Sequence, residues 1–234
     1  MAMSFQFKQF SIQQNATAMK VGTDGVLLGA WCSITESAIL DIGTGTGLIA
    51  LMLAQRSKTA LIDAVEIEQE AFSQILENIA NSKWTNRITA FNSSIQDYTP
   101  NKKYDVIVSN PPFFINSTKA PNTERNTARH TDDLSFKDLI GAIYRLLKPK
   151  GIFSLILPKS EAKQFIKLAI SQHLFLNREC IVKPNPTKEA KRILMEFSFI
   201  KNNLIKEELT IETETRHQYT KEYISLTQDF YLNF

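Results

Sequence analysis

The run Ala38-Ile39-Leu40-Asp41-Ile42-Gly43-Thr44-Gly45-Thr46-Gly47 decides the fold of this chain. Its first half is a short apolar segment typical of a buried strand, and its second half places a glycine at every other position. The apolar residues 48–54 follow at once and predict the start of a helix. Glycines let a ligand approach the backbone closely, and the amino end of a helix favours negative or partly negative groups. A strand, a glycine-rich turn and a helix in this order predict a site for a nucleotide cofactor.

Short apolar runs alternate with helical segments along the rest of the chain. Strands that alternate with helices predict an α/β fold with a parallel, doubly wound sheet. The last strands lack full crossover helices and therefore predict an antiparallel edge. We expect a Rossmann-like doubly wound seven-stranded sheet, mainly parallel with an antiparallel edge, plus a short N-terminal extension. The strands are predicted at 38–42, 60–66, 87–94, 104–109, 152–157, 177–183 and 192–200, with 205–211 a candidate for one more, and the helices at 69–80, 135–147, 160–171 and 219–231.

Composition and length favour one domain. The 234 residues are 43% hydrophobic and contain no linker rich in Gly, Ser or Pro, so we expect a single domain over 1–234, with 1–37 as a cap over the cofactor site and 38–234 as the core. Within the cap, Gly22-Thr23-Asp24-Gly25 predicts a tight turn before a short apolar helix. Cys32 and Cys180 match no metal-ligand spacing and are expected to be reduced packing residues. No apolar stretch is long enough to span a membrane and no secretion signal is recognised, so a cytoplasmic protein is expected.

A second motif follows the predicted strand 104–109, in the run Val106-Ile107-Val108-Ser109-Asn110-Pro111-Pro112-Phe113-Phe114. Two prolines cannot continue a central strand, so the strand must end in a rigid turn. In open α/β sheets, ligands bind beyond the carboxyl ends of the strands. The Asn110 side-chain oxygen and the Pro111 carbonyl can accept both protons of a planar NH2 group, while Phe113 stacks on the base that carries it. Asn110, Pro111, Pro112 and Phe113 are therefore the predicted reaction centre.

Two cofactors are compatible with the glycine turn. Gly45-Thr46-Gly47-Leu48-Ile49-Ala50 matches the dinucleotide pattern, and Glu66 lies 19 positions after Gly47, where a carboxylate would bind the two ribose hydroxyls, so an NAD oxidoreductase is a candidate. However, no hydride-transfer partner is recognisable. The wider run from Asp41 to Gly47 is typical of S-adenosylmethionine enzymes, in which the carboxylate before the glycines faces the methionine amino group. Together with Asn-Pro-Pro-Phe on a neighbouring strand, this favours methyl transfer to nitrogen.

Basic residues gather in two segments beside the predicted centre. The net charge of the chain is only +3, but residues 183–192 contain Lys183, Lys188, Lys191 and Arg192 against one Glu. The polar segment 116–131 contains Arg125, Arg129 and His130. Such residues bind nucleic-acid phosphates without reading sequence. A solvated charged face and, for Arg129 and His130, a hydrogen-bonded loop are the alternatives. The candidate RNA contacts are Lys20, Arg125, Arg129, His130, Lys188, Lys191 and Arg192.

On these motifs the chain resembles the class I S-adenosylmethionine-dependent amino-methyltransferases and, more narrowly, the bacterial tRNA1(Val) adenine-N6 methyltransferases. The narrower resemblance also covers Phe5-Gln6-Phe7-Lys8-Gln9-Phe10, Met19-Lys20-Val21-Gly22-Thr23-Asp24-Gly25, Ala128-Arg129-His130-Thr131 and Lys183-Pro184-Asn185-Pro186-Thr187-Lys188. Asn-Pro-Pro-Phe itself is shared with guanine N2 and protein glutamine N5 methyltransferases, which remain alternative functions. A non-catalytic RNA-binding module with a vestigial cofactor pocket is a further alternative.

The resemblance implies a set of site residues and a substrate. Thr23 and Asp24 would lie near the methionine end of S-adenosylmethionine. Ser94 or Asp97 would take the place of the acidic residue that binds the cofactor adenine in many relatives. The implied substrate is adenosine 37, just 3′ of the anticodon, in the anticodon stem-loop of tRNA1(Val), and a monomer without metal is expected. The full cofactor set is Thr23, Asp24, Asp41, Gly43, Gly45, Gly47, Glu66, Ser94 and Asn110.

Overall fold

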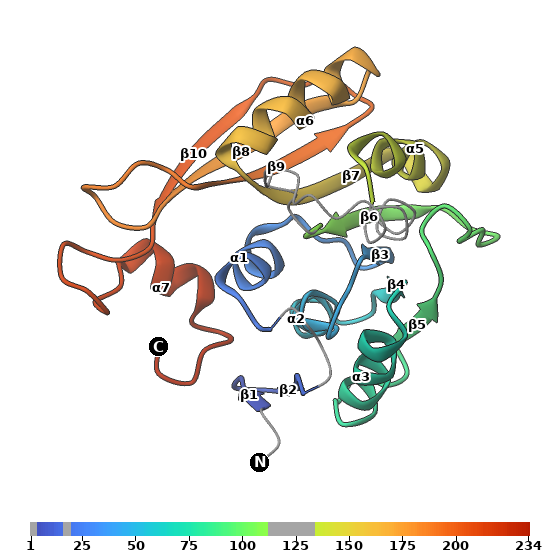
Figure 1. Cartoon of the computed structure of the whole chain (residues 1–234), viewed down its shortest axis with the longest axis horizontal. Coiled ribbons are helices and arrows are strands. Elements are labelled where there is room, and N and C mark those ends of the chain that lie inside the picture. The colour runs from blue at the N-terminus through green and yellow to red at the C-terminus, as the bar shows by residue number, and fades with distance from the viewer. Residues whose placement is uncertain (1–3, 16–19, 112–133) are drawn as a thin grey trace, which may run out of the picture.

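The computed structural model of the chain describes residues 4–15, 20–111 and 134–234. Within them an eight-stranded sheet runs through the molecule in the order β10-β8-β9-β7-β6-β3-β4-β5 (Figure 1). Only β9 is antiparallel to its neighbours in the described sheet, and all other neighbouring strands in it are parallel. The strands are β3 (Ala38–Ile42), β4 (Leu61–Glu66), β5 (Ile88–Asn92), β6 (Tyr104–Ser109), β7 (Leu147–Pro158), β8 (Phe175–Lys183), β9 (Arg192–Ser198) and β10 (Ile205–Thr210).

Helices cover both faces of the sheet because side chains alternate between its faces along each strand. The consecutive residues Val106 and Ile107 on β6 are both fully buried, yet they belong to different hydrophobic cores. α1, α2, α3 and α7 pack over the Val106 core, and α5 and α6 over the Ile107 core. This arrangement confirms the expected doubly wound α/β fold. The helices are α1 (Thr23–Trp31), α2 (Leu48–Arg56), α3 (Gln69–Ala80), α5 (Phe136–Leu146), α6 (Lys159–Ser171) and α7 (Lys221–Thr227).

Several predicted boundaries agree closely with the structure. The helix predicted at 69–80 is α3, and the strand predicted at 104–109 is β6. Ser135 is the N-cap of α5, where its hydroxyl oxygen accepts a hydrogen bond from the Asp138 N–H at 3.1 Å. Each of these elements has a local sequence signal, which is an amphipathic period, an apolar run or a capping side chain. Such signals involve neighbouring residues only and therefore predict the element without knowledge of the fold.

The strand count needs a correction. The sheet has eight strands rather than seven, because the candidate strand at 205–211 does form. It is β10, which pairs in parallel with β8, from Ile205 opposite Arg178 to Thr210 opposite Lys183. Most of β10 is exposed or half-buried, so its sequence lacks the apolar signal of the central strands. Its backbone pairs with an existing strand, which a sequence pattern alone does not reveal.

Four local predictions differ from the structure. The 22–25 segment is not a tight turn, because Gly22 is the N-cap of α1 and the helix begins at Thr23. The strand predicted at 152–157 begins earlier, because β7 starts at Leu147, which already pairs with Tyr104. The helix predicted at 160–171 begins at Lys159, after Pro158, and the Ser160 hydroxyl bonds to Glu161 rather than capping the helix. The final helix is also shorter than predicted and ends at Thr227.

The N-terminal extension forms a hairpin that packs against the end of the chain. β1 (Ser4–Gln6) and β2 (Ser11–Gln13) are antiparallel, and the ring centroids of Phe7 and Phe10 lie 4.7 Å apart. The Lys8 amine donates to the carbonyls of Gln228 at 2.6 Å and Phe234 at 2.8 Å. These contacts hold the two ends of the chain together on one side of the molecule (Figure 1).

Candidate active site

Strands β3 and β6 bring the two motifs to one edge of the sheet. The two strands are parallel neighbours, and Ile42 on β3 pairs with Ser109 on β6. The Ser109 hydroxyl donates to the Ile42 carbonyl at 3.0 Å, which fixes this end of the pair. Gly43 and Asn110 are the next residues, so the glycine turn and the Asn-Pro turn leave the sheet side by side. Sequence reasoning placed both motifs at neighbouring strand ends, and the register shows that arrangement.

The glycine turn needs glycine for reasons of backbone conformation and space. Gly43, Gly45 and Gly47 have φ angles of 66°, 58° and 83°, in the left-handed region that other residues rarely adopt. A Cβ at Gly47 would lie 2.7 Å from Ile75 Cγ1, so the amino end of α2 packs closely on α3. Around Gly43 and Gly45, by contrast, a Cβ would meet no described atom within 4 Å. The first two glycines therefore leave open space beside the backbone.

Asp41 places a buried carboxylate under this turn. Its Oδ2 accepts from the Thr44 hydroxyl at 2.6 Å and from the Ala50 N–H at 3.2 Å. Its Oδ1 is buried and has no hydrogen-bond partner among the described residues. Burial raises the pKa of the Asp41 carboxyl from 3.8 to about 7. A buried oxygen without a donor is costly, so Asp41 suits a hydrogen-bonding group that the described residues do not supply.

Glu66 ties the end of β4 to the glycine turn. Glu66 is 7% exposed, and its two carboxylate oxygens accept from the Gly45 N–H at 2.8 Å and from the Glu68 N–H at 2.9 Å. Each carboxylate oxygen has a second lone pair, so these bonds leave acceptor capacity for a ligand. Glu66 and Asp41 both lie on the face of the sheet that α2 and α3 cover, because each alternates with residues of that core.

Asn110 presents a second unsatisfied oxygen at the same edge. The side chain is half-buried, and its Oδ1 is buried without a hydrogen-bond partner among the described residues. Its Nδ2 lies 3.9 Å from the position of a Cβ at Gly25, so the first turn of α1 approaches the amide. Pro111 follows and is buried. Pro112 and Phe113 lie outside the described residues, as do Arg125, Arg129 and His130.

The first turn of α1 links the centre to the basic segment. Asp24 Oδ2 accepts from Arg192 Nε at 2.7 Å, and the two side chains are 22% and 31% exposed. Thr23, beside it, is exposed. Asp24 was predicted near the cofactor and Arg192 near the RNA, and the structure joins them in one ion pair. Arg192 is the first residue of β9, where it pairs with Pro158 at the end of β7.

Because β9 runs antiparallel to β7, the loop before it lies at the carboxyl edge of the parallel strands. Lys188 and Lys191 are exposed in this loop. Lys183 ends β8 at the same edge, where its amine pairs with Glu208 at 2.7 Å. Lys20 is exposed at the start of the segment that leads into α1. The basic residues predicted from sequence in this loop therefore lie at the same edge of the sheet as Gly43 and Asn110.

Ser94 begins a short turn after β5. Its hydroxyl lies 2.6 Å from Asp97 Oδ2 and accepts from the Asp97 N–H at 3.1 Å. Arg145 of α5 donates to the carbonyls of Ile95, at 2.5 Å, and of Tyr98. Ser94 and Asp97 thus bond to each other at one end of the turn, and Arg145 holds the other end.

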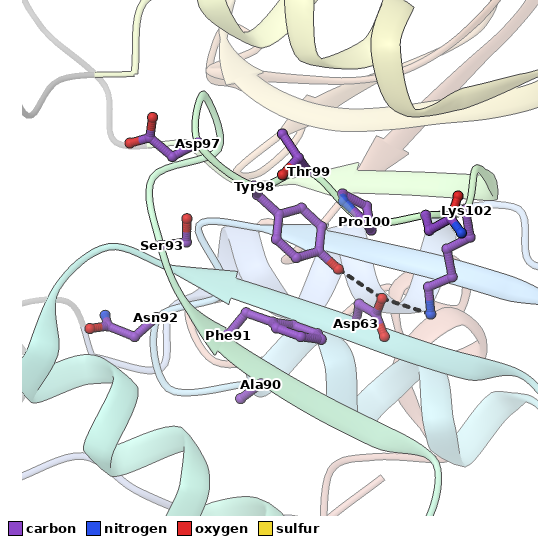
Figure 2. A pocket seen from close by; sticks show the side chains of 11 residues that line it. Asp63, Ala90, Phe91, Asn92, Ser93, Asp97, Tyr98, Thr99, Pro100 and Lys102 are labelled. Carbon is purple, nitrogen blue, oxygen red and sulfur yellow. Dashed lines mark hydrogen bonds and ion pairs between the residues drawn. The ribbon is translucent and has the colours of Figure 1, made fainter.

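A groove of about 650 Å³ lies beside this turn, between the end of β5 and residues 97–102 (Figure 2). Asp63 Oδ2 accepts from the Tyr98 hydroxyl at 2.8 Å and pairs with the Lys102 amine at 2.8 Å, as the dashed lines in Figure 2 show. The Tyr104 hydroxyl also donates to this oxygen, at 2.5 Å. Asp63 and Glu66 are three residues apart on β4, so their side chains point to opposite faces. The groove is therefore on the other face from Asp41 and Glu66.

Comparison with known proteins identifies the family. Residues 18–156 match the family model of the methyltransferase small domain. The chain is 49% identical over 232 residues to the tRNA1(Val) (adenine(37)-N6)-methyltransferase of Flavobacterium psychrophilum, with 97% of this chain and 99% of that protein covered. It is 50% identical to the protein of the same name from Parabacteroides distasonis, with 97% of each chain covered. The chain belongs to this methyltransferase family.

Solved structures agree with the fold of the methyltransferase. A predicted O-methyltransferase from Agrobacterium tumefaciens has a TM-score of 0.71 at 18% identity, with 88% of this chain and 96% of that chain covered. M. jannaschii TYW2, crystallised in complex with AdoMet, has a TM-score of 0.58 at 15% identity, with 85% of this chain and 87% of that chain covered. These likenesses support the Rossmann-like architecture.

The described residues bear on the expectations for metal binding, membrane spans and thiol pairing. In residues 4–15, 20–111 and 134–234, His, Cys, Asp and Glu side chains form no group of three that could hold a metal ion. No helix in these ranges is long and apolar enough to cross a membrane. Cys32 and Cys180 are buried and form no disulfide, and burial raises the pKa of each thiol to about 12. They are packing residues, as the sequence predicted.

Sequence reasoning missed one residue that shapes the site. Asn78 of α3 is 1% exposed and donates to the carbonyls of Thr46, at 2.9 Å, and of Gln13, at 3.0 Å. Its Oδ1 also accepts from the Gln13 N–H at 2.8 Å. One amide therefore binds both the glycine turn and the N-terminal extension. The available signal was a polar residue on the apolar face of a helix, which by itself does not name its partners.

Proposed function

We propose that this chain transfers a methyl group from S-adenosylmethionine to the N6 amino group of adenosine 37 in tRNA1(Val), the reaction for which its relatives are named. One observation carries the proposal. Two buried oxygens without partners among the described residues, Asp41 Oδ1 and Asn110 Oδ1, lie at the carboxyl ends of neighbouring strands. The first suits an ammonium group of the cofactor, and the second suits an amino group of the substrate.

The described residues fit S-adenosylmethionine, which supplies an electrophilic methyl group on its sulfonium when it is bound. Asp41 Oδ1 would accept from the methionine ammonium group, with Thr23 and Asp24 near the same end. Gly43, Gly45 and Gly47 would let the cofactor lie against the backbone, since two of them border open space. Glu66 would use its remaining lone pairs for the ribose hydroxyls, and Ser94, with Asp97, would lie at the adenine.

At the acceptor, the chain has to make an aromatic amine more nucleophilic. The lone pair of an adenine N6 is delocalised into the ring, so the amine is a poor nucleophile. Asn110 Oδ1 and the Pro111 carbonyl would each accept one of its protons, which favours a pyramidal nitrogen with a free lone pair. Phe113 would stack on the base, a contact worth about 1–3 kcal/mol in comparable cases. Catalysis would then come from positioning and from exclusion of water, and no side chain needs to act as a base before transfer.

The tRNA would bind across the edge where Asn110 lies. Lys188 and Lys191 lie at this edge in the loop before β9, and Lys20 precedes α1. Arg192 would act through its ion pair with Asp24 as well as on RNA. The remaining candidate contacts, Arg125, Arg129 and His130, follow the Asn-Pro-Pro-Phe motif in the sequence. We further propose a monomeric cytoplasmic enzyme with one methyltransferase domain over 1–234, in which 1–37 cap the cofactor site and 38–234 form the core.

A labelling experiment tests the function. Unmodified tRNA1(Val) is incubated with the protein and S-adenosylmethionine labelled in its methyl group, digested to nucleosides and analysed by mass spectrometry. We expect label in N6-methyladenosine, and a transcript with guanosine in place of adenosine 37 should receive none. Label in N2-methylguanosine, or transfer to a protein glutamine, would replace the proposed acceptor. Tight tRNA binding without any transfer would indicate a non-catalytic RNA-binding module.

A further inference from the structure

Helix α6 carries a row of lysines on its exposed side. Lys159, Lys163 and Lys167 follow one another at intervals of four residues and are all exposed. Residues four apart lie on the same side of a helix, with Cβ atoms about 5–6 Å apart. The opposite side of α6 buries Ala162 and Phe165 in the core. The lysines therefore form a straight basic row of about 12 Å, from the rise of 1.5 Å per residue.

The row begins at the edge of the sheet where the reaction centre lies. α6 follows directly from the carboxyl end of β7, and β7 is the parallel neighbour of β6, which leads into Asn110. The Lys159 N–H donates to the Lys191 carbonyl at 3.2 Å, so the first residue of α6 is bonded to the basic loop before β9. Figure 1 shows α6 lying beside β8 and β9. The loop lysines and the α6 row are thus one continuous surface.

Little negative charge opposes this surface. The Lys159 amine lies 3.7 Å from Glu189 Oε2, but the Glu189 side chain is 93% exposed, so the pair is weak and easily exchanged. In the part of the chain that the structure describes, neither Lys163 nor Lys167 has an ion-pair partner. A row of solvated amines at regular spacing matches a regular row of negative charges, and a nucleic-acid backbone provides such a row.

We propose that Lys159, Lys163 and Lys167 bind the phosphate backbone of the substrate RNA stem and guide it away from the reaction centre. This inference rests on the proposed function, because it takes RNA as the substrate. The row starts beside the protein loop that contains Lys188 and Lys191. The RNA stem would therefore run along α6 once a nucleotide of the RNA loop has reached Asn110. The contacts are to phosphates, so they contribute affinity and orientation but no choice of base.

The test removes the three positive charges of the α6 row and compares this triple variant with a control triple variant that loses the same charge elsewhere. Lys159→Gln, Lys163→Gln and Lys167→Gln are combined in one protein. The control combines Lys58→Gln, Lys83→Gln and Lys103→Gln, three lysines that are also exposed and also lower the net charge by three. The control lysines precede β4, β5 and β6, so they lie at the opposite edge of the sheet.

Binding of tRNA is measured by fluorescence anisotropy over a range of salt concentrations, with the cofactor product present. Each lost phosphate contact should lower the slope of log affinity against log salt by about 0.7–0.9, so the α6 variant should lose about 2–3 in slope and weaken about tenfold or more at low salt. Its KM for tRNA should rise while its kcat at saturating tRNA and its cofactor affinity stay unchanged. The control should stay within about twofold of the wild type.

Equal weakening of the two triple variants would overturn the proposal, because net charge alone would then explain binding. Unchanged tRNA affinity in the α6 variant would also overturn it. Matching melting temperatures show that both variants fold, and the single variant Lys163→Glu provides a second, charge-reversed test at the centre of the row. The nucleoside assay on the wild type is independent, so a wrong acceptor and a wrong RNA surface give different results.

Discussion

Replacing Asp41 with Asn tests the cofactor site directly. One Asp41 oxygen already accepts from Thr44 and from the Ala50 N–H, and the amide oxygen of Asn can keep both bonds. The amide NH2 would then stand where Oδ1, which has no partner among the described residues, stands in the wild type. In the proposed complex it would point a donor at the ammonium group of S-adenosylmethionine. Loss of a charge-assisted bond at a buried position costs about 2–4 kcal/mol, so the Kd for the cofactor should rise by about 30- to 1,000-fold.

The pH dependence of cofactor binding gives a second, narrower estimate of the role of Asp41. The pKa of Asp41 is raised to about 7, so its carboxyl is about one-tenth ionised near pH 6 and half ionised near pH 7. If the ionised form binds the ammonium group as proposed, cofactor affinity should increase about fivefold over this interval in the wild type. Asp41→Asn should lose this increase of about fivefold, whereas any pH effect that arises elsewhere should remain in both proteins.

The same shift affects the stability of the protein without cofactor. The folded-state pKa lies above the unfolded value, so the folded protein binds the proton more tightly and its stability falls as pH rises from about 4 to 7.

Isothermal titration calorimetry measures cofactor binding, and thermal melting measures the stability of the protein without cofactor. Glu196→Gln, which removes another buried carboxylate at a distant strand, is the control and should leave the binding profile unchanged. A wild-type Kd that is independent of pH, or an Asp41→Asn protein that binds normally, would refute the role of Asp41.

Three further substitutions test the site. Asn110→Ala should lower kcat by about a thousandfold and leave the cofactor Kd within about threefold, as measured by nucleoside mass spectrometry and calorimetry; a loss of cofactor affinity alone would make Asn110 a binding residue. Gly47→Ala should lower the free energy of unfolding by about 2–3 kcal/mol in urea melts, because the Gly47 φ angle is 83° and the new Cβ would lie 2.7 Å from Ile75 Cγ1. Adding Ile75→Ala to this variant should recover part of the lost stability. Asn78→Ala removes three hydrogen bonds and should lower the free energy of unfolding by about 2–3 kcal/mol. Trypsin should then cleave the N-terminal extension faster, and an unchanged cleavage rate would mean that the Asn78 amide does not hold this extension.

Sequence patterns predicted most of the architecture because its signals are local. The apolar runs of β3 and β6, the period of α3 and the Ser135 cap each involve neighbouring residues only, so each could be recognised without the fold. β10 was harder, because its stability comes from pairing with β8 rather than from its own apolar pattern. The first turn of α1 was misread because glycines mark turns and helix caps alike.

The sequence by itself indicated the chemistry of the site, since the Asp41–Gly47 turn and Asn110-Pro111 each follow a recognisable strand, and the first and fourth strands are neighbours in the Rossmann strand order. Only the tertiary structure decided which polar atoms are satisfied and which are left for ligands. Asn78 reaches Gln13 across 65 positions, and Arg192 reaches Asp24 across 168. Such partners meet only when the sheet has assembled, because a hydrogen bond depends on distances of a few ångströms in space and not on separation along the chain.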